Sequence, residues 1–254
     1  KESALALTHT HKTHTMASSA RAALLPNQQT SPPEPKTPIN PNVKIMWLVV
    51  ASLGVSESIW SQTVLVNFLR DTLGANRWVG YIEAAQGAAN VLFALPIGIA
   101  ADRGRSRVIR IGACLTPLAA GLTAYGVLAG GSHYVPGVPV TQIDTRLFGL
   151  FVASMALWGI TSAIAHGPAE ALYADSMATG DRSRGYTILF SIYLAASIAG
   201  PLTTIIMFAT DGDRWDVGVM QKIVLCGLAL EIPAALLMFG LRDSAALNEE
   251  ADPV

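Results

Sequence analysis

Three acidic side chains stand inside long apolar stretches of this sequence, where a charge could do chemistry. Glu57 and Glu231 lie near the middle of their stretches, and Glu83 lies toward one end of its stretch. An ionised group at the centre of a bilayer costs at least about 2.5 to 3.5 kcal/mol, so such groups usually contact a substrate or carry a proton. A neutral, hydrogen-bonded structural role is the alternative for each. Glu57 is the strongest of the three candidates.

Polar side chains on the same stretch support this interpretation of Glu57. Spacings of four, seven and four place them on one face of a helix, which is unlikely to face lipid. They are Ser52, Ser56, Thr63 and Asn67. Trp60 and Gln62 add groups for stacking and hydrogen bonding, although an aromatic side chain here is more often a packing residue. We therefore expect Glu57, Trp60, Gln62, Glu83 and Glu231 to take part in substrate contact or proton coupling.

A second pair of ionisable residues lies four positions apart near the end of the fourth apolar stretch. His166 and Glu170 can meet on one face of a helix at this spacing. Such a pair could relay a proton, and a simple interfacial pair is the alternative.

No metal site or cofactor is predicted. Cys114 and Cys226 each lie inside an apolar run and are typical of small buried hydrophobic residues. Three histidines of the polar N-terminal segment lack cysteine or carboxylate partners, so we do not interpret them as ligands. These are His9, His11 and His14.

The composition places the candidate residues in a membrane protein. Of 254 residues, 51% are hydrophobic and 14% charged, and the mean hydropathy is +0.41, too apolar for an ordinary soluble domain. The net charge of -1, with no basic run interleaved with aromatics, argues against a nucleic-acid partner. Residues 1–42 are polar and predict a disordered tail. An alternative for Met16–Leu25 is an organelle transit peptide, because it is rich in Ser, Ala and Arg and free of acids.

Six apolar runs follow, each close to the length of about 20 residues that a helix needs to cross a bilayer. Only helices satisfy their own backbone hydrogen bonds over such continuous runs, so we predict an all-α, six-helix transmembrane domain over residues 43–241. The expected spans are Val43–Leu69, Trp78–Ala100, Val108–Gly130, Leu147–Leu172, Tyr186–Ala209 and Val219–Leu241. Prolines inside them predict local kinks. They are Pro96, Pro117, Pro168, Pro201 and Pro233.

Basic residues predict the orientation. They concentrate in the loop between the second and third spans and in the loop between the fourth and fifth, which the positive-inside rule assigns to the cytoplasm. They are Arg103, Arg105, Arg107, Arg110, Arg182 and Arg184. Both termini are then cytoplasmic, and the plasma membrane is the favoured membrane.

The segment from Gly98 to Arg107, read Gly-Ile-Ala-Ala-Asp-Arg-Gly-Arg-Ser-Arg, resembles the signature loop of the major facilitator superfamily. Gly98, Asp102, Arg103 and Arg107 match its pattern in register. The loop glycine comes one place early as Gly104, so that Arg105 takes its expected slot, and a serine replaces one basic residue.

The resemblance implies that these four matching residues form a cytoplasmic gate. It also implies secondary active transport of a small solute by alternating access, with proton coupling left open. That fold needs twelve helices, so we expect this chain to be its N-terminal half, with a missing C-terminal half or a second six-helix copy as partner, and residues 242–254 to begin a polar linker. A non-transporting scaffold or receptor is the alternative. An intramembrane enzyme is the least favoured, because no nucleophile or metal motif is present.

Overall fold

The computed structural model describes residues 38–138, 140, 142–211 and 215–247. The tail predicted for residues 1–42 lies outside this part up to residue 37, as do its three histidines and the Met16–Leu25 segment. The described residues form helices joined by short turns, and none of them lies in a strand.

Six helical spans are long and apolar enough to cross a membrane, which confirms the predicted all-α class and indicates an integral, multi-pass membrane protein. Spans 1 to 6 are Pro41–Leu73, Asn76–Ala101, Arg105–His133, Thr145–Ala174, Thr179–Thr210 and Val217–Met238. Each of them contains most of one predicted span. Their helices are α2 (Pro41–Trp60), α3 (Thr63–Leu73), α4 (Asn76–Ala101), α5 (Arg105–His133), α6 (Thr145–Ile164), η1 (Ala165–Ala169), α7 (Glu170–Ala174), η2 (Thr179–Asp181), α8 (Arg182–Ser197), α9 (Ala199–Asp211) and α10 (Val217–Met238), followed by η3 (Asp243–Ala245).

Spans 1, 4 and 5 are interrupted. In span 5, α8 and α9 separate at Ile198, three residues before Pro201. In span 1, α2 ends at Trp60 and the chain turns before α3. The Ser61 amide still makes an α-helical bond to the Glu57 carbonyl at 3.0 Å, and the Ser61 hydroxyl donates to the same carbonyl at 2.7 Å, a contact that often bends helices. In span 4, η1 is a π-helix that contains Pro168. Proline has no N–H to continue an α-helical ladder, and π-turns inside α-helices often mark functional sites.

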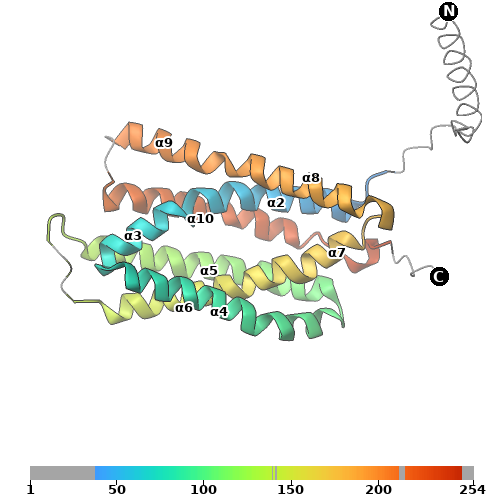
Figure 1. Cartoon of the computed structure of the whole chain (residues 1–254), viewed down its shortest axis with the longest axis horizontal. Coiled ribbons are helices and arrows are strands. Elements are labelled where there is room, and N and C mark those ends of the chain that lie inside the picture. Colours follow the sequence, from blue (N-terminus) through green and yellow to red (C-terminus); the bar gives the residue numbers. More distant parts are fainter. Residues whose placement is uncertain (1–37, 139, 141, 212–214, 248–254) are drawn as a thin grey trace, which may run out of the picture. The chain divides into compact units, whose positions relative to one another are not determined.

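The spans pack in a pattern that repeats after three helices. Span 1 packs mainly on spans 5 and 6, span 4 packs mainly on spans 2 and 3, and spans 3 and 6 pack on each other. Exchanging span 1 with 4, 2 with 5 and 3 with 6 reproduces these pairs. Figure 1 shows the result, with α8 and α9 at one edge, α4 and α6 at the other, and α2, α10 and α5 between. Because successive spans alternate in direction, the two triplets run in opposite senses.

Spans 2 and 5, which lie at opposite edges, expose apolar side chains. On α4 and on α8–α9 the exposed residues include Val91, Leu92, Leu95, Phe190, Leu194, Leu202 and Ile205. The core includes Phe68 of α3, Phe151 of α6 and Met220 of α10. Exposed apolar faces of this extent need a lipid or protein surround rather than water.

Candidate functional site

Most of the basic loop residues gather at one end of the bundle, which we call the arginine-rich end. It holds the start of α2, the α4–α5 turn, the end of α7, the start of α8 and the segment after α10 (Figure 1). The α4–α5 turn is made by Gly104, whose φ of 154° lies in the region that favours glycine. The early position of this glycine leaves the next slot to Arg105, at the start of α5.

Arg105 forms the main ion pair of this end. Its guanidinium contacts the carboxylate of Asp175, just after α7, and Arg182 Nη2 approaches the second Asp175 oxygen at 3.5 Å. One carboxylate therefore joins spans 3, 4 and 5. Each of the three side chains is roughly one third exposed, so solvent weakens the pairing.

The four residues predicted to form the gate lie elsewhere in this region. Gly98, Asp102, Arg103 and Arg107 are all exposed, and none of their side chains has a hydrogen-bond or ion-pair partner among the described residues. The sequence prediction did not identify Arg105, Asp175 and Arg182 as the ion-paired residues of this end. Asp175 could have indicated these pairs, because it is an acid at the end of span 4 and a basic loop follows it.

A short segment after α10 ties the helix ends together. We call residues 242–247 the strap. The buried Asn42 side chain donates to the Arg242 carbonyl at 2.9 Å and accepts from the Arg242 amide at 3.1 Å. Asp243 accepts from the amide and hydroxyl of Ser106 at the start of α5. The Leu247 amide donates to the Asp175 carbonyl at 2.8 Å. These residues open the predicted polar linker, and the linker beyond residue 247 lies outside the described part.

Farther along the spans, Glu57 lies on a partly exposed face of α2. Tyr193 of α8 donates its hydroxyl to Glu57 Oε2 at 3.2 Å. On span 4, His166 Nδ1 pairs with Glu170 Oε1 at 3.0 Å within η1 and α7, as the spacing predicted. One helix, α8, contacts both groups: Tyr186 donates its hydroxyl to the Glu170 carbonyl at 3.2 Å, and Tyr193, two turns later, donates to Glu57. The predicted pair and Glu57 therefore both lie beside α8, and we call this stretch along α8 the polar region.

Trp60 and Glu231 are instead sealed in the core. Trp60 is 4% exposed and Glu231 is 0% exposed, and Trp60 Nε1 donates to Glu231 Oε1 at 2.9 Å. The predicted polar stripe is also wrong in part. The helix breaks between Ser56 and Thr63, and Ser56 is buried, with its hydroxyl donating to the Gly227 carbonyl of α10 at 3.2 Å.

Gln62 and Glu83 do not join the polar region. Gln62 is exposed at the break of span 1, and Glu83 is exposed on α4 with no hydrogen-bond or ion-pair partner among the described residues. The five residues predicted for substrate or proton coupling therefore fall into three settings: a partly exposed face for Glu57, the core for Trp60 and Glu231, and separate exposed positions for the other two.

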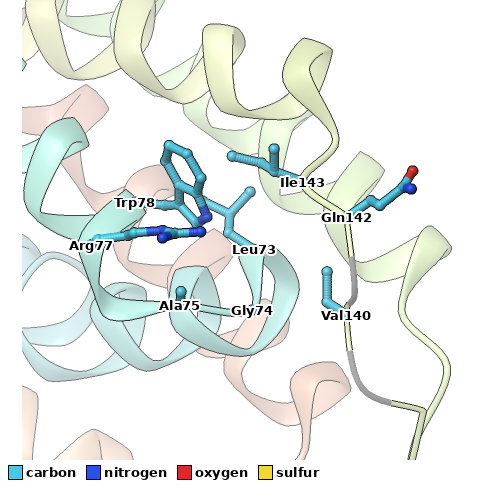
Figure 2. A pocket seen from close by; sticks show the side chains of 8 residues that line it. All are labelled: Leu73, Gly74, Ala75, Arg77, Trp78, Val140, Gln142 and Ile143. Atoms are coloured by element: carbon cyan, nitrogen blue, oxygen red, sulfur yellow. The ribbon is translucent and has the colours of Figure 1, made fainter.

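Two hollows open on the described surface. One, of about 430 Å³, lies between α4, the start of α5 and η1, and its polar lining residues are Asn90, Asp102, Arg105 and His166. It connects the α4–α5 turn with the His166 side chain. The other, of about 350 Å³, lies at the opposite end between the α3–α4 and α5–α6 loops. Figure 2 shows it: Arg77 lies over the Trp78 ring, 4.7 Å from its centroid, and Gln142 points away from both.

Over the described ranges, no group of three or more His, Cys, Asp or Glu side chains is arranged to hold a metal ion. Comparison with family models, with curated proteins and with solved structures finds no match for this chain, so its function has to be inferred from the geometry of its own residues.

Proposed function

We propose that this chain is one six-helix half of a secondary active transporter of the major facilitator type, which moves a small solute by alternating access. The observation that carries the proposal is the pair of interruptions beside polar side chains in spans 1 and 4. The α8–α9 break of span 5 has no counterpart in span 2 and does not support the proposal. Spans 1 and 4 correspond to each other in the repeated packing pattern, and a polar side chain, Glu57 or His166, lies at or beside each interruption. Inverted repeats with interrupted helices at equivalent places are typical of transporter binding sites.

The chemistry of this region suits a solute site. Glu57 offers a carboxyl that is only partly buried, Tyr193 offers a hydroxyl, and His166 with Glu170 offers a second ionisable pair. In this proposal Glu57 contacts the solute or carries a coupled proton. The exposed apolar faces of α4 and α8–α9 are where a second six-helix unit packs, and the Arg105–Asp175–Arg182 cluster opens and closes the arginine-rich, cytoplasmic end.

A thermal-stability screen over a broad set of small solutes tests the proposal. A ligand that binds only the folded protein stabilises it by about 2.7 kcal/mol at one hundred times its Kd. We expect solutes that stabilise the wild-type chain in lipid nanodiscs to lose their effect on Glu57→Gln, which keeps shape and hydrogen bonding but cannot ionise.

The matched control is Asp71→Asn, which removes the same charge from α3 near the opposite end of span 1. It should leave the ligand effect intact. A solute that passes this screen is then tested for uptake into vesicles. Stabilisation that is equal in wild type and Glu57→Gln would contradict the proposal. So would a bound solute that is never carried into vesicles that hold the chain together with its second six-helix unit.

A further inference from the structure

Glu231 is the most completely buried acid among the described residues, and it makes one hydrogen bond that links two helices. Its Oε1 accepts from Trp60 Nε1 at 2.9 Å, while Oε2 has no hydrogen-bond partner in the described part of the chain. Burying a polar group without full hydrogen bonding is unfavourable. The residue is therefore not explained by packing alone, because a leucine would fill the same space without a polar atom to satisfy.

A second hydrogen bond, one turn away, reinforces the same contact. Ser56 donates to the Gly227 carbonyl at 3.2 Å, and Gly227 precedes Glu231 by four residues as Ser56 precedes Trp60. A Cβ added at Gly227 would lie 2.6 Å from the Cβ of Trp60, so the glycine permits this close approach. Together the two bonds fix α10 against the last turn of α2.

The contact continues from Trp60 into span 4. The Trp60 and Trp158 rings lie 5.0 Å apart at 38°, and Trp158 Nε1 donates to the Thr123 hydroxyl of α5 at 3.0 Å. The Trp60 ring thus touches α10 on one side and α6 on the other.

Glu57 shares the last turn of α2 with Trp60. Beyond Trp60 the helix is broken, so the α2 ladder holds this turn from the N-terminal side only, and side-chain contacts help to fix its rotation. A rotation that moves the Trp60 ring must also move the Glu57 carboxyl, three residues earlier. We propose that Glu231 is a positioning residue: through its hydrogen bond to Trp60 it holds the last turn of α2 so that Glu57 meets the Tyr193 hydroxyl. This inference rests on the proposed function only for the role of Glu57 in binding a solute or a proton. The link from Glu231 through Trp60 to Glu57 does not depend on that role.

Fluorine and nitrogen magnetic resonance of the full chain in nanodiscs test it. The chain has five tryptophans and six tyrosines, so ¹⁵N-indole and fluorotyrosine labels give few signals. Trp60→Phe assigns the indole of Trp60, and Tyr193→Phe assigns the fluorine of Tyr193. Glu57→Gln then gives the Tyr193 signal that results when the carboxylate partner is lost.

Glu231→Leu should shift the Trp60 indole signal and also move the Tyr193 fluorine signal toward its position in Glu57→Gln. Glu231→Gln keeps a carbonyl acceptor for the indole and should keep Tyr193 near its wild-type position. The matched control is Thr123→Val, which removes the acceptor of the other core tryptophan. It should shift the Trp158 indole and leave Tyr193 unchanged.

If Glu231→Leu does not fold, Trp60→Phe breaks the same bond from its other end and should move Tyr193 in the same direction. A Tyr193 signal that stays at its wild-type position in these variants would overturn the inference, and so would an equal response to Thr123→Val. These signals do not depend on transport. A chain in which Tyr193 responds to Glu231→Leu but which neither binds nor carries a solute would contradict only the proposed function. Glu57-dependent uptake with an unresponsive Tyr193 would contradict only this inference.

Discussion

Replacing Gly227 by alanine should separate α10 from α2. The added Cβ would lie 2.6 Å from Trp60 Cβ, 3.0 Å from its amide nitrogen and 3.1 Å from its Cδ1, whereas non-bonded atoms of this kind prefer about 3.5 to 4.0 Å. Two of these atoms belong to the Trp60 backbone and Cβ, which cannot rotate away. The helices must therefore move apart by roughly 1 Å.

A displacement of that size removes two hydrogen bonds. It would lengthen the Ser56–Gly227 bond from 3.2 Å and the Trp60–Glu231 bond from 2.9 Å beyond hydrogen-bonding distance. At about 1 kcal/mol for each bond, with some residual strain, the loss in the free energy of unfolding is about 2 to 3 kcal/mol. For a chain of this length that corresponds to a Tm lower by roughly 4 to 12 °C.

Thermal unfolding in one detergent, followed by tryptophan fluorescence, measures this effect. The matched control is Gly121→Ala on α5, where an added Cβ meets no atom within 4 Å. It should leave Tm unchanged or raise it slightly, because alanine is the better helix former by about 1 kcal/mol. Equal Tm values for the two alanine variants would show that α10 does not approach α2 as described.

Three other predictions concern the arginine-rich end and its orientation. A reporter cysteine at Ser132 should react with an impermeant thiol reagent from outside intact cells and one at Thr179 should not, and the reverse labelling would refute a cytoplasmic arginine-rich end. Asp175→Asn should lower the free energy of unfolding by about 1 to 2 kcal/mol because two arginines lose their carboxylate partner, whereas Asp102→Asn should stay within about 0.5 kcal/mol of wild type; equal effects would argue against the pairing. Gly104→Ala should destabilise the α4–α5 turn by about 1 to 3 kcal/mol because alanine is strained at positive φ, and unchanged proteolysis of this turn would contradict its geometry.

The six spans could be predicted from the sequence because their signal is local. Length and apolarity alone decide which segments cross a bilayer, and the structure places helices at all six predicted runs. The prediction began the first span at Val43, whereas α2 begins at Pro41, where Asn40 caps it by accepting from the Asn42 amide. A capping residue inside a polar segment has no hydropathy signal.

The interruptions were only partly predictable. Pro168 and Pro201 were expected to kink their spans. The π-helix η1 contains Pro168, and α8 and α9 separate three residues before Pro201, but Pro96, Pro117 and Pro233 sit inside continuous helices. The break after Trp60 has no proline or glycine to announce it. Ser61 bonds back to the Glu57 carbonyl at this break, but serine and threonine make the same bond inside unbroken helices, so the sequence does not mark the position.

The candidate site was also only partly predictable from the sequence. The His166–Glu170 pair follows from helical spacing, and the structure confirms it. The contact between Glu231 and Trp60 could not be predicted from the sequence. It requires knowing that α10 packs on α2, and the two residues lie 171 positions apart in the chain. Tyr193, the partner of Glu57, had no signal in its own sequence neighbourhood.

During synthesis, the strap can join the helix ends only after the six spans have been translated. Its residues are translated after every span, yet its hydrogen bonds join the ends of α2, α5 and α7. Until the ribosome has passed residue 247, the buried Asn42 lacks its Arg242 partner and the start of α5 lacks its acidic cap. The arginine-rich ends of spans 1, 3 and 4 therefore gain these links only as a late event, and a nascent chain stalled before the strap would hold six inserted helices without them.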